Sequence, residues 1–141
     1  FFQKEQFRLG TVNTTTFILM LAQRAPLSFI TGSPITLREV LKEYNRNEFH
    51  HIFPKAYLKS SGQNGNYSEN CFANFCFLSK ADNIQLGAVA PSVYRAKMPD
   101  NIDEILFHAL IPEEVFEDNY DKFIQLRAEL LSKYANELID Y

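Results

Sequence analysis

Long hydrophobic runs are missing from this 141-residue sequence. The longest candidate, around Phe17–Ala22, lies between polar residues and is far shorter than the roughly 18–20 apolar residues that cross a bilayer. A signal-peptide pattern and an initiator methionine are also missing at Phe1, so we expect a C-terminal piece of a longer cytoplasmic protein. Hydrophobic residues make up 46% and charged residues 22%, which is typical of a globular chain rather than a disordered one.

Cysteine is scarce, and the two that occur are not spaced as a metal motif. Cys71 and Cys76 lie five positions apart, which is not the CxxC spacing of structural zinc sites. We therefore expect two reduced, buried thiols, as in a cytoplasmic protein. The length of the chain suits one domain with a real hydrophobic core.

Basic residues are fewer than acidic ones, and the net charge is −3. Taken alone, this argues mildly against a nucleic-acid partner. The acidic residues are concentrated at one end, however: residues 98–141 carry 3 basic and 11 acidic side chains, for a net charge of −8. Residues 46–97 carry 6 basic and 3 acidic side chains, for a net charge of +3. Since the local field steers a phosphate more than the total charge does, the middle segment suits a phosphate-containing partner.

Sequence patterns predict helices on both sides of a small, irregular β segment. Thr36 begins a T-x-x-E capping box, and residues 118–138 show the strongest helical periodicity. Two short apolar runs, 46–53 and 75–78, are strand-like and can pair as a hairpin across a polar loop. The expected fold is α+β and mostly helical, with helices at 13–24, 36–44, 101–110 and 118–138, helical turns at 56–59 and 81–86, and a loop at 60–69.

Four polar residues of the middle segment form a candidate site. His50 and His51 are adjacent within an apolar run, and neighbours on a strand point to opposite faces, so one packing role cannot explain both. Asn74 opens the second strand-like run, and Asn83 lies early in the next helical turn. Imidazole nitrogen and amide oxygen can ligate a divalent cation, and a second imidazole can take a proton from water near neutral pH. Each asparagine alone would be read as a turn or cap residue, so only the set indicates a site.

These residues resemble the HNH endonuclease signature. The match consists of the letters HHIFP from His50, the letters NFCFL from Asn74, and Asn83. The resemblance implies a ββα-metal core at about residues 46–90 and a metal-dependent endonuclease that hydrolyses DNA phosphodiester bonds. It also implies that His50 and Asn83 ligate the metal, that His51 is the general base, and that Asn74 holds the base in place. The implied cofactor is a divalent metal ion, with Mg²⁺ first and Mn²⁺ or Ni²⁺ also possible.

A narrower resemblance covers more of the chain. The stretches HHIFP, NFCFLSKADN, PSVYRAK and DNYDKFIQLRAELL together resemble the C-terminal nuclease domain of GmrSD-like modification-dependent restriction proteins. In that group a ParB/Srx-like NTPase domain precedes the HNH domain on one chain, and this sequence has no Gly-rich phosphate loop of its own. The resemblance implies that residues 1–141 are a single HNH nuclease domain of a restriction or phage-defence protein, with DNA as its partner and no membrane association.

The sequence departs from the HNH pattern in two ways. The paired CxxC motifs that many HNH proteins carry are absent, so no structural zinc is implied. The lysine that often follows the last ligand is also missing, which leaves four candidates for phosphate contacts: Lys55, Lys80, Arg95 and Lys97. Two alternatives stay open, namely an inactive HNH-like module that binds nucleic acid or docks a partner domain, and a nuclease that acts on RNA.

Three further residues receive predictions that concern structure more than chemistry. Arg127 falls on the inward face of the last predicted helix, and because a buried arginine needs a partner, we expect it to contact a carboxylate or a carbonyl group. Tyr94 fits either a substrate groove or the core. His108 is expected to be structural or exposed.

Overall fold

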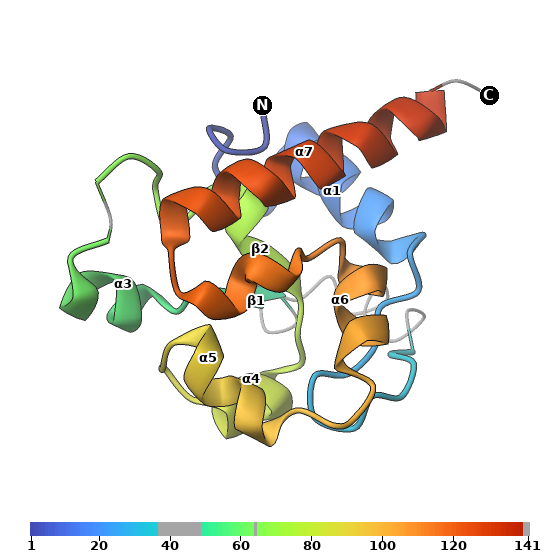
Figure 1. The fold of residues 1–141 in the computed structure, drawn as a ribbon. Helices are drawn as coiled ribbons and strands as arrows, with labels where there is room; N and C mark the ends of the chain where they lie inside the picture. The colour runs from blue at the N-terminus through green and yellow to red at the C-terminus, as the bar shows by residue number, and fades with distance from the viewer. Residues whose placement is uncertain (37–48, 64, 140–141) are drawn as a thin grey trace.

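The computed structural model describes residues 1–36, 49–63 and 65–139, which adopt a mostly helical α+β fold with one small sheet (Figure 1). Most of the helix predicted at 36–44 and the first part of the strand predicted at 46–53 fall outside these ranges. In chain order, with η marking 3₁₀ helices, the elements are α1 (Val12–Ala22), β1 (Phe49–His51), α3 (Lys55–Ser61), η2 (Phe72–Asn74), β2 (Phe75–Phe77), α4 (Lys80–Leu86), α5 (Pro91–Tyr94), η3 (Arg95–Lys97), α6 (Ile102–Ala109), η4 (Glu113–Glu117) and α7 (Tyr120–Ile139).

The two strands pair as a small antiparallel sheet at the centre of the molecule (Figure 1). Their register is Phe49 with Phe77, His50 with Cys76, and His51 with Phe75. Because paired residues of a sheet share a face and successive residues alternate, His51 lies on the face of Phe75 and His50 lies on the opposite face with Cys76. The predicted hairpin is therefore confirmed, and it is built from two strands of three residues each.

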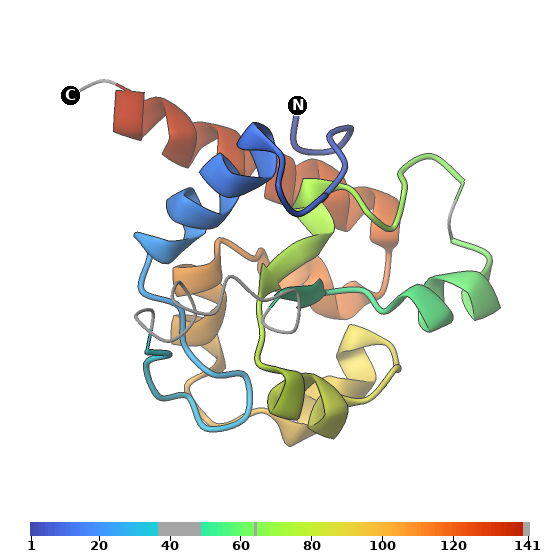
Figure 2. The ribbon, with the colours of Figure 1, turned by 180° about the vertical axis from the view of Figure 1, so that it is seen from behind.

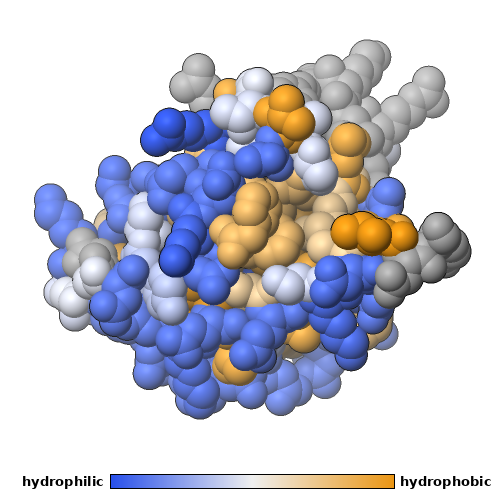
Figure 3. Space-filling model, turned by 90° about the horizontal axis from the view of Figure 1, so that it is seen from above, coloured by the Kyte–Doolittle hydropathy of each residue, from blue (hydrophilic) through white to orange (hydrophobic). Residues whose placement is uncertain are grey.

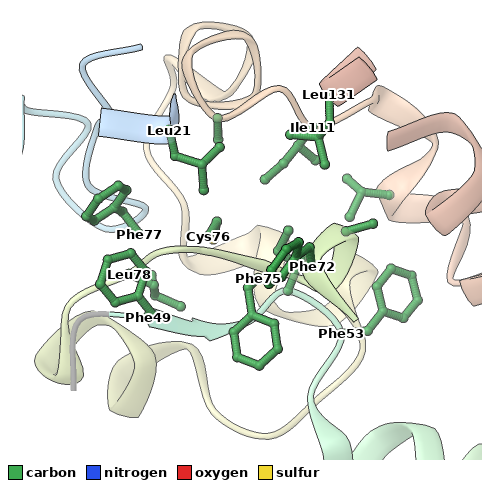
Figure 4. Packing of buried hydrophobic residues seen from close by; sticks show 14 of the residues in the cluster. Leu21, Phe49, Phe53, Phe72, Phe75, Cys76, Phe77, Leu78, Ile111 and Leu131 are labelled. Carbon is green, nitrogen blue, oxygen red and sulfur yellow. The ribbon is translucent and has the colours of Figure 1, made fainter. Parts of the chain in front are cut away.

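The long helix α7 closes the core above the sheet. It crosses the top of the molecule in Figure 1, and α1 lies beside it in both views (Figures 1 and 2). Its inward face carries Phe123 and Leu131, both fully buried. Figure 4 shows Leu21 of α1 and Cys76 of β2 among the side chains of the same interior as Leu131. Since full burial of a large apolar side chain contributes about 1.5–3 kcal/mol, this interior holds the hairpin firmly against the helices.

Arg127 of α7 is fully buried in the core, and its partners are backbone carbonyl groups. Its guanidinium donates to the oxygen atoms of Ala73, Phe75, Ala109 and Leu110 at distances of 2.9, 2.5, 3.1 and 3.3 Å. Burial lowers the pKa of Arg127 to about 10, so the group stays charged at neutral pH. The prediction of a carbonyl contact is confirmed, and the bonds join α7 to the start of β2 and to the end of α6.

Residues 87–100, which show no clear period in the sequence, form the short helices α5 and η3. Pro91 occupies the first position of α5, where its fixed φ suits a helix and its missing N–H costs no bond. Tyr94 is buried, and its hydroxyl donates to the carbonyl oxygen of Ile52 at 2.9 Å. Of the two roles open to Tyr94, the structure therefore shows the core role. Pro112 precedes η4 as its N-cap residue.

Several smaller features complete the fold. Cys71 and Cys76 are buried free thiols, as predicted. The Nδ1 atom of His108 lies 2.9 and 2.8 Å from the carbonyl oxygens of Arg24 and Ala25, which is a structural role. Seen from above, Figure 3 shows apolar surface gathered among hydrophilic residues. Among the described residues, no helix has both the length and the apolar character needed to cross a membrane.

Candidate functional site

A solvent-open pocket of about 430 Å³ lies between the hairpin and the two helices that follow its strands. Its lining includes four of the residues singled out in the sequence, namely His50, His51, Lys55 and Asn83. In Figure 2 the chain leaves β2 and turns into α4 below the hairpin, which brings Asn83 to the histidines. The histidines lie on opposite faces of the sheet, and both nevertheless line the pocket.

His51 is half-buried and is held by a side chain that sequence reasoning did not single out. Its Nε2 atom lies 3.0 Å from Oδ1 of Asn70, and its ring packs against Phe75 with centroids 4.5 Å apart. Burial lowers the pKa of His51 below its usual value, while the hydrogen bond with Asn70 and the nearby Glu69 carboxylate oppose this shift. The shift favours the uncharged imidazole, which is the form that a general base needs.

Asn74 is fully buried and lies beside the site rather than in the pocket lining. Its Oδ1 atom accepts from the backbone N–H of Phe53 at 2.8 Å. Its Nδ2 atom donates to the carbonyl oxygens of Phe53 at 3.1 Å and of Glu69 at 2.9 Å. These bonds fix the chain two residues after His51 and one residue before Asn70. Within the described part of the chain, the side chain of Asn74 thus bonds to the backbone of Phe53 and Glu69, and the hydrogen bond with the His51 imidazole is made by Asn70.

Asn83 is positioned by the cap of its helix. The Ser79 hydroxyl accepts from the backbone N–H of Asp82 at 3.0 Å, which is the N-cap bond that starts a helix. The Asp82 carboxylate also accepts from the Ser28 hydroxyl at 2.6 Å, so a loop after α1 is fastened to the first turn of α4. Among the described residues, the side chain of Asn83 makes no hydrogen bond, and its amide group remains available at the pocket.

Two residues of the pocket lining carry donor atoms of the kind that ligate divalent cations. The imidazole of His50 and the amide oxygen of Asn83 are both suitable donors, and they line one open pocket that leaves room for water and phosphate oxygens, as Mg²⁺ prefers. Within the described part of the chain, no group of three or more His, Cys, Asp and Glu side chains is arranged to hold a metal ion. An amide oxygen can also ligate such an ion, and Asn83 brings one to the pocket lining beside His50.

The four candidate phosphate contacts are placed differently from one another. Lys55 lines the pocket; its side chain is 69% exposed and its Nζ lies 4.0 Å from the Glu69 carboxylate. Lys80 is exposed at the start of α4 and outside the pocket lining. Lys97 donates to the carbonyl oxygen of Gln85 at 2.8 Å. Arg95 lies over the ring of Phe116, 4.6 Å from its centroid, so of the four only Lys55 borders the pocket.

Three residues of the site were not identified from the sequence. Glu69 ends the polar loop predicted at 60–69, which sequence reasoning treated as a connection only, and Asn70 follows directly after it. Ile84 follows Asn83, is 68% exposed, and lines the pocket. The one available signal was the position of Asn70, four residues before Asn74, in a segment that a hairpin returns toward His51.

Comparisons with known proteins give little beyond the geometry. No family model matches the chain, and no solved structure matches it. The chain is similar to the protein described as "Uncharacterized protein MJ0686" from Methanocaldococcus jannaschii, with 27% identity over 125 aligned residues. That alignment covers 68% of this chain and 21% of the relative, so the chain spans about a fifth of the length of the curated relative that it matches.

Proposed function

We propose that this chain is a metal-dependent HNH endonuclease that hydrolyses DNA phosphodiester bonds, with β1, β2 and α4 as its ββα-metal core. The observation that carries the proposal is the pocket that His50, His51 and Asn83 line together. These residues come from a strand and from a helix more than thirty positions away, and their order and spacing match the HNH signature. A chance set of polar residues would have little reason to converge on one pocket.

His51 is the proposed general base. Its uncharged imidazole takes a proton from water, the water oxygen attacks phosphorus in line, and the bond from phosphorus to the leaving 3′ oxygen breaks. The leaving oxygen takes a proton from solvent water. A positioned base supplies about 10²–10⁴-fold of rate, which is well below the 10⁶–10¹⁷-fold typical of enzymes, so charge stabilisation and positioning must supply the rest.

His50 and Asn83 are the proposed holders of a divalent cation, with Mg²⁺ first and Mn²⁺ or Ni²⁺ as alternatives. When bound there, such an ion supplies electrostatic stabilisation of the charge that develops on the phosphate and on the leaving oxygen. Lys55 borders the same pocket and is the proposed phosphate contact among the four basic candidates. Its exposure and its long distance from Glu69 leave its ammonium group free to turn toward a phosphate, because such surface pairs are weak.

The proposal extends to the biological setting that the resemblance implies. The chain would act as the nuclease part of a restriction or phage-defence protein in the cytoplasm, together with a ParB/Srx-like NTPase domain on the same full-length chain. The match to a stretch of a much longer relative is compatible with a domain of a larger protein. It does not identify the accompanying domain.

A plasmid-nicking assay tests the activity. The chain is incubated with supercoiled DNA and Mg²⁺, Mn²⁺ or Ni²⁺, and the conversion to open circles is measured. We expect metal-dependent nicking that His51→Ala reduces by at least about 10²-fold. The matched control is His108→Gln. His108 lies on α6 and contacts the backbone carbonyl groups of Arg24 and Ala25, so we expect this change to leave nicking intact. Nicking by His51→Ala at the wild-type rate would contradict the base assignment.

A second measurement separates the nuclease from the inactive module. Calorimetry with Mn²⁺ should show binding to the wild-type chain, weaker binding to His50→Ala and Asn83→Ala, and unchanged binding to His108→Gln. DNA binding without nicking under any of the three metal ions would favour the alternative of a catalytically inactive HNH-like module. Cleavage of RNA in preference to DNA would redirect the substrate assignment.

A further inference from the structure

The contact between His51 and Asn70 determines which nitrogen of the imidazole carries the proton, as well as where the ring lies. An amide oxygen can only accept a hydrogen bond, so the 3.0 Å approach of Asn70 Oδ1 to His51 Nε2 requires the proton of the imidazole to lie on Nε2. A neutral imidazole carries one such proton, and Nδ1 is then the nitrogen with a free lone pair. Only a nitrogen with a free lone pair can take a proton from water.

Asn70 is itself held firmly by its surroundings. Its backbone N–H donates to the Ser68 hydroxyl at 3.1 Å, and its carbonyl oxygen accepts from the backbone N–H of Phe7 at 2.8 Å. The side chain of Asn74 donates to the carbonyl oxygen of Glu69, the residue immediately before Asn70. A local bond with Ser68, a long-range bond with Phe7, and the bond from Asn74 to the preceding residue therefore hold the backbone around Asn70, which limits how far its short side chain can move.

The imidazole ring is confined as well. It packs against the ring of Phe75, whose plane is inclined by 42° to it, and Phe75 is 6% exposed and part of the core. Rotation of the imidazole to exchange its two nitrogens would break the bond with Asn70 and would disturb this packing. The arrangement therefore favours one orientation and one tautomer.

We infer that Asn70 is a positioning residue that holds His51 as the Nε2-protonated tautomer and so makes Nδ1 the atom that accepts the proton from water. The inference rests on the proposed function for its catalytic meaning, while the tautomer itself is a property of the folded chain. The general principle is that the nitrogen that carries the proton is set by the hydrogen bond that the ring makes elsewhere.

Nitrogen-15 NMR of the histidine-labelled chain tests the inference without any assay of activity. Protonated and unprotonated ring nitrogens have well-separated shifts, so the spectrum reports the tautomer of His51 directly. We expect a protonated Nε2 and a bare Nδ1 in the metal-free wild-type chain above the pH at which the ring charges. A bare Nε2 would mean that the amide of Asn70 is turned and donates instead, and this would overturn the inference.

Two variants and a control extend the test. Asn70→Leu keeps the size of the side chain and removes the acceptor, so we expect a mixture of tautomers and a fall in kcat of roughly 10- to 10²-fold, part of the contribution of a general base, with KM for plasmid DNA unchanged. Asn70→Asp keeps an acceptor and is expected to restore the Nε2-protonated form. Asn66→Leu changes another asparagine of the same loop, which bonds to Asp121, and should change neither the spectrum nor kcat.

The outcomes separate the inference from the proposed function. If the wild-type chain cleaves no DNA but shows the expected tautomer, and Asn70→Leu disturbs it, the nuclease proposal fails and the assignment of Asn70 stands. If the chain cleaves DNA but Asn70→Leu leaves the tautomer and kcat unchanged, the assignment of Asn70 fails and the nuclease proposal stands. Should Asn70→Leu not fold, the wild-type spectrum and the Asn70→Asp variant still decide the question.

Discussion

Asn74 and Phe53 exchange two hydrogen bonds across 21 positions of sequence: Oδ1 of Asn74 accepts from the Phe53 N–H at 2.8 Å, and Nδ2 donates to the Phe53 carbonyl at 3.1 Å. Both residues are fully buried. The side chain of Asn74 thus pairs with Phe53 much as a neighbouring strand would, at a point where β1 has already ended. It prolongs the link between the two strands beyond His51 and holds the chain that leaves the site.

Replacing Asn74 with alanine should destabilise the fold more than an ordinary substitution does. The change removes three hydrogen bonds and leaves the buried N–H of Phe53 without its acceptor, and each unmatched buried group costs about 1–3 kcal/mol. We expect the free energy of unfolding to fall by about 2–4 kcal/mol, measured by urea denaturation. Asn66→Ala, at an exposed position of the loop, serves as the control and should change it by less than about 0.5 kcal/mol.

The prediction for Asn74 also separates two kinds of role. If Asn74→Ala is as stable as the wild type, the buried bonds do not contribute as argued. If it is destabilised but the folded fraction still nicks DNA at the wild-type rate, the residue supports the fold and not the base. The resemblance alone could not distinguish these outcomes.

The hairpin could be predicted from the sequence because each of its two strands shows a local pattern of apolar residues. The strand-like runs 46–53 and 75–78 predicted a hairpin, and the structure pairs residues 49–51 with 75–77. The predicted position of Asn83 early in the following helix agrees with its place in the same pocket lining as the histidines. The contact of Arg127 followed from its position on the inward face of a regular helix. Each of these depends on periodicity, which the sequence displays directly.

The partner of the His51 ring could not be predicted in the same way. Asn70 reaches His51 only because the polar loop returns along a particular path, and that path depends on the pairing of Phe7 with Asn70 and on the bond from Asn74 to Glu69. These are long-range contacts with no periodic signal. Likewise, charge counts could not show that the ammonium group of Lys97 donates to the Gln85 carbonyl.

Arg127 offers a second test of stability, because its charge is balanced by carbonyl groups rather than by a carboxylate. Arg127→Met fills a similar volume but provides no donor, and we expect the free energy of unfolding to fall by about 2–4 kcal/mol in urea denaturation. Arg127→Lys should not rescue the loss, since one ammonium group cannot reproduce the planar fork of donors. Arg95→Lys, at an exposed position, is the matched control and should cost less than about 1 kcal/mol.

The two thiols should be unreactive in the folded chain. Burial raises the pKa of Cys76 to about 12, and it also raises the pKa of Cys71, partly opposed by the Tyr120 hydroxyl nearby. Since the thiolate is the reactive form, a disulfide reagent at mildly alkaline pH should label neither residue until urea unfolds the protein. Rapid labelling of the folded chain would show that this part of the core opens far more readily than its packing indicates.

The pH dependence of His51 provides the last prediction. Burial lowers its pKa in the folded chain below the usual 6.5, against the opposing effect of Asn70. Between the folded pKa and 6.5, the unfolded chain therefore binds more protons than the folded chain, so the free energy of unfolding rises with pH across this window and levels off above it. The stabilisation is present above about pH 6.5 and is lost as the pH falls through the folded pKa.

NMR titration of the metal-free chain should accordingly place the midpoint of His51 below 6.5. In urea denaturation, the difference in unfolding free energy between the wild type and His51→Gln should vary with pH inside that window and remain constant above it. His108→Gln controls for a histidine outside the pocket. A midpoint above 6.5 would mean that Glu69 and Asn70 outweigh burial, and it would reduce the share of uncharged His51 that can act as a base near neutral pH.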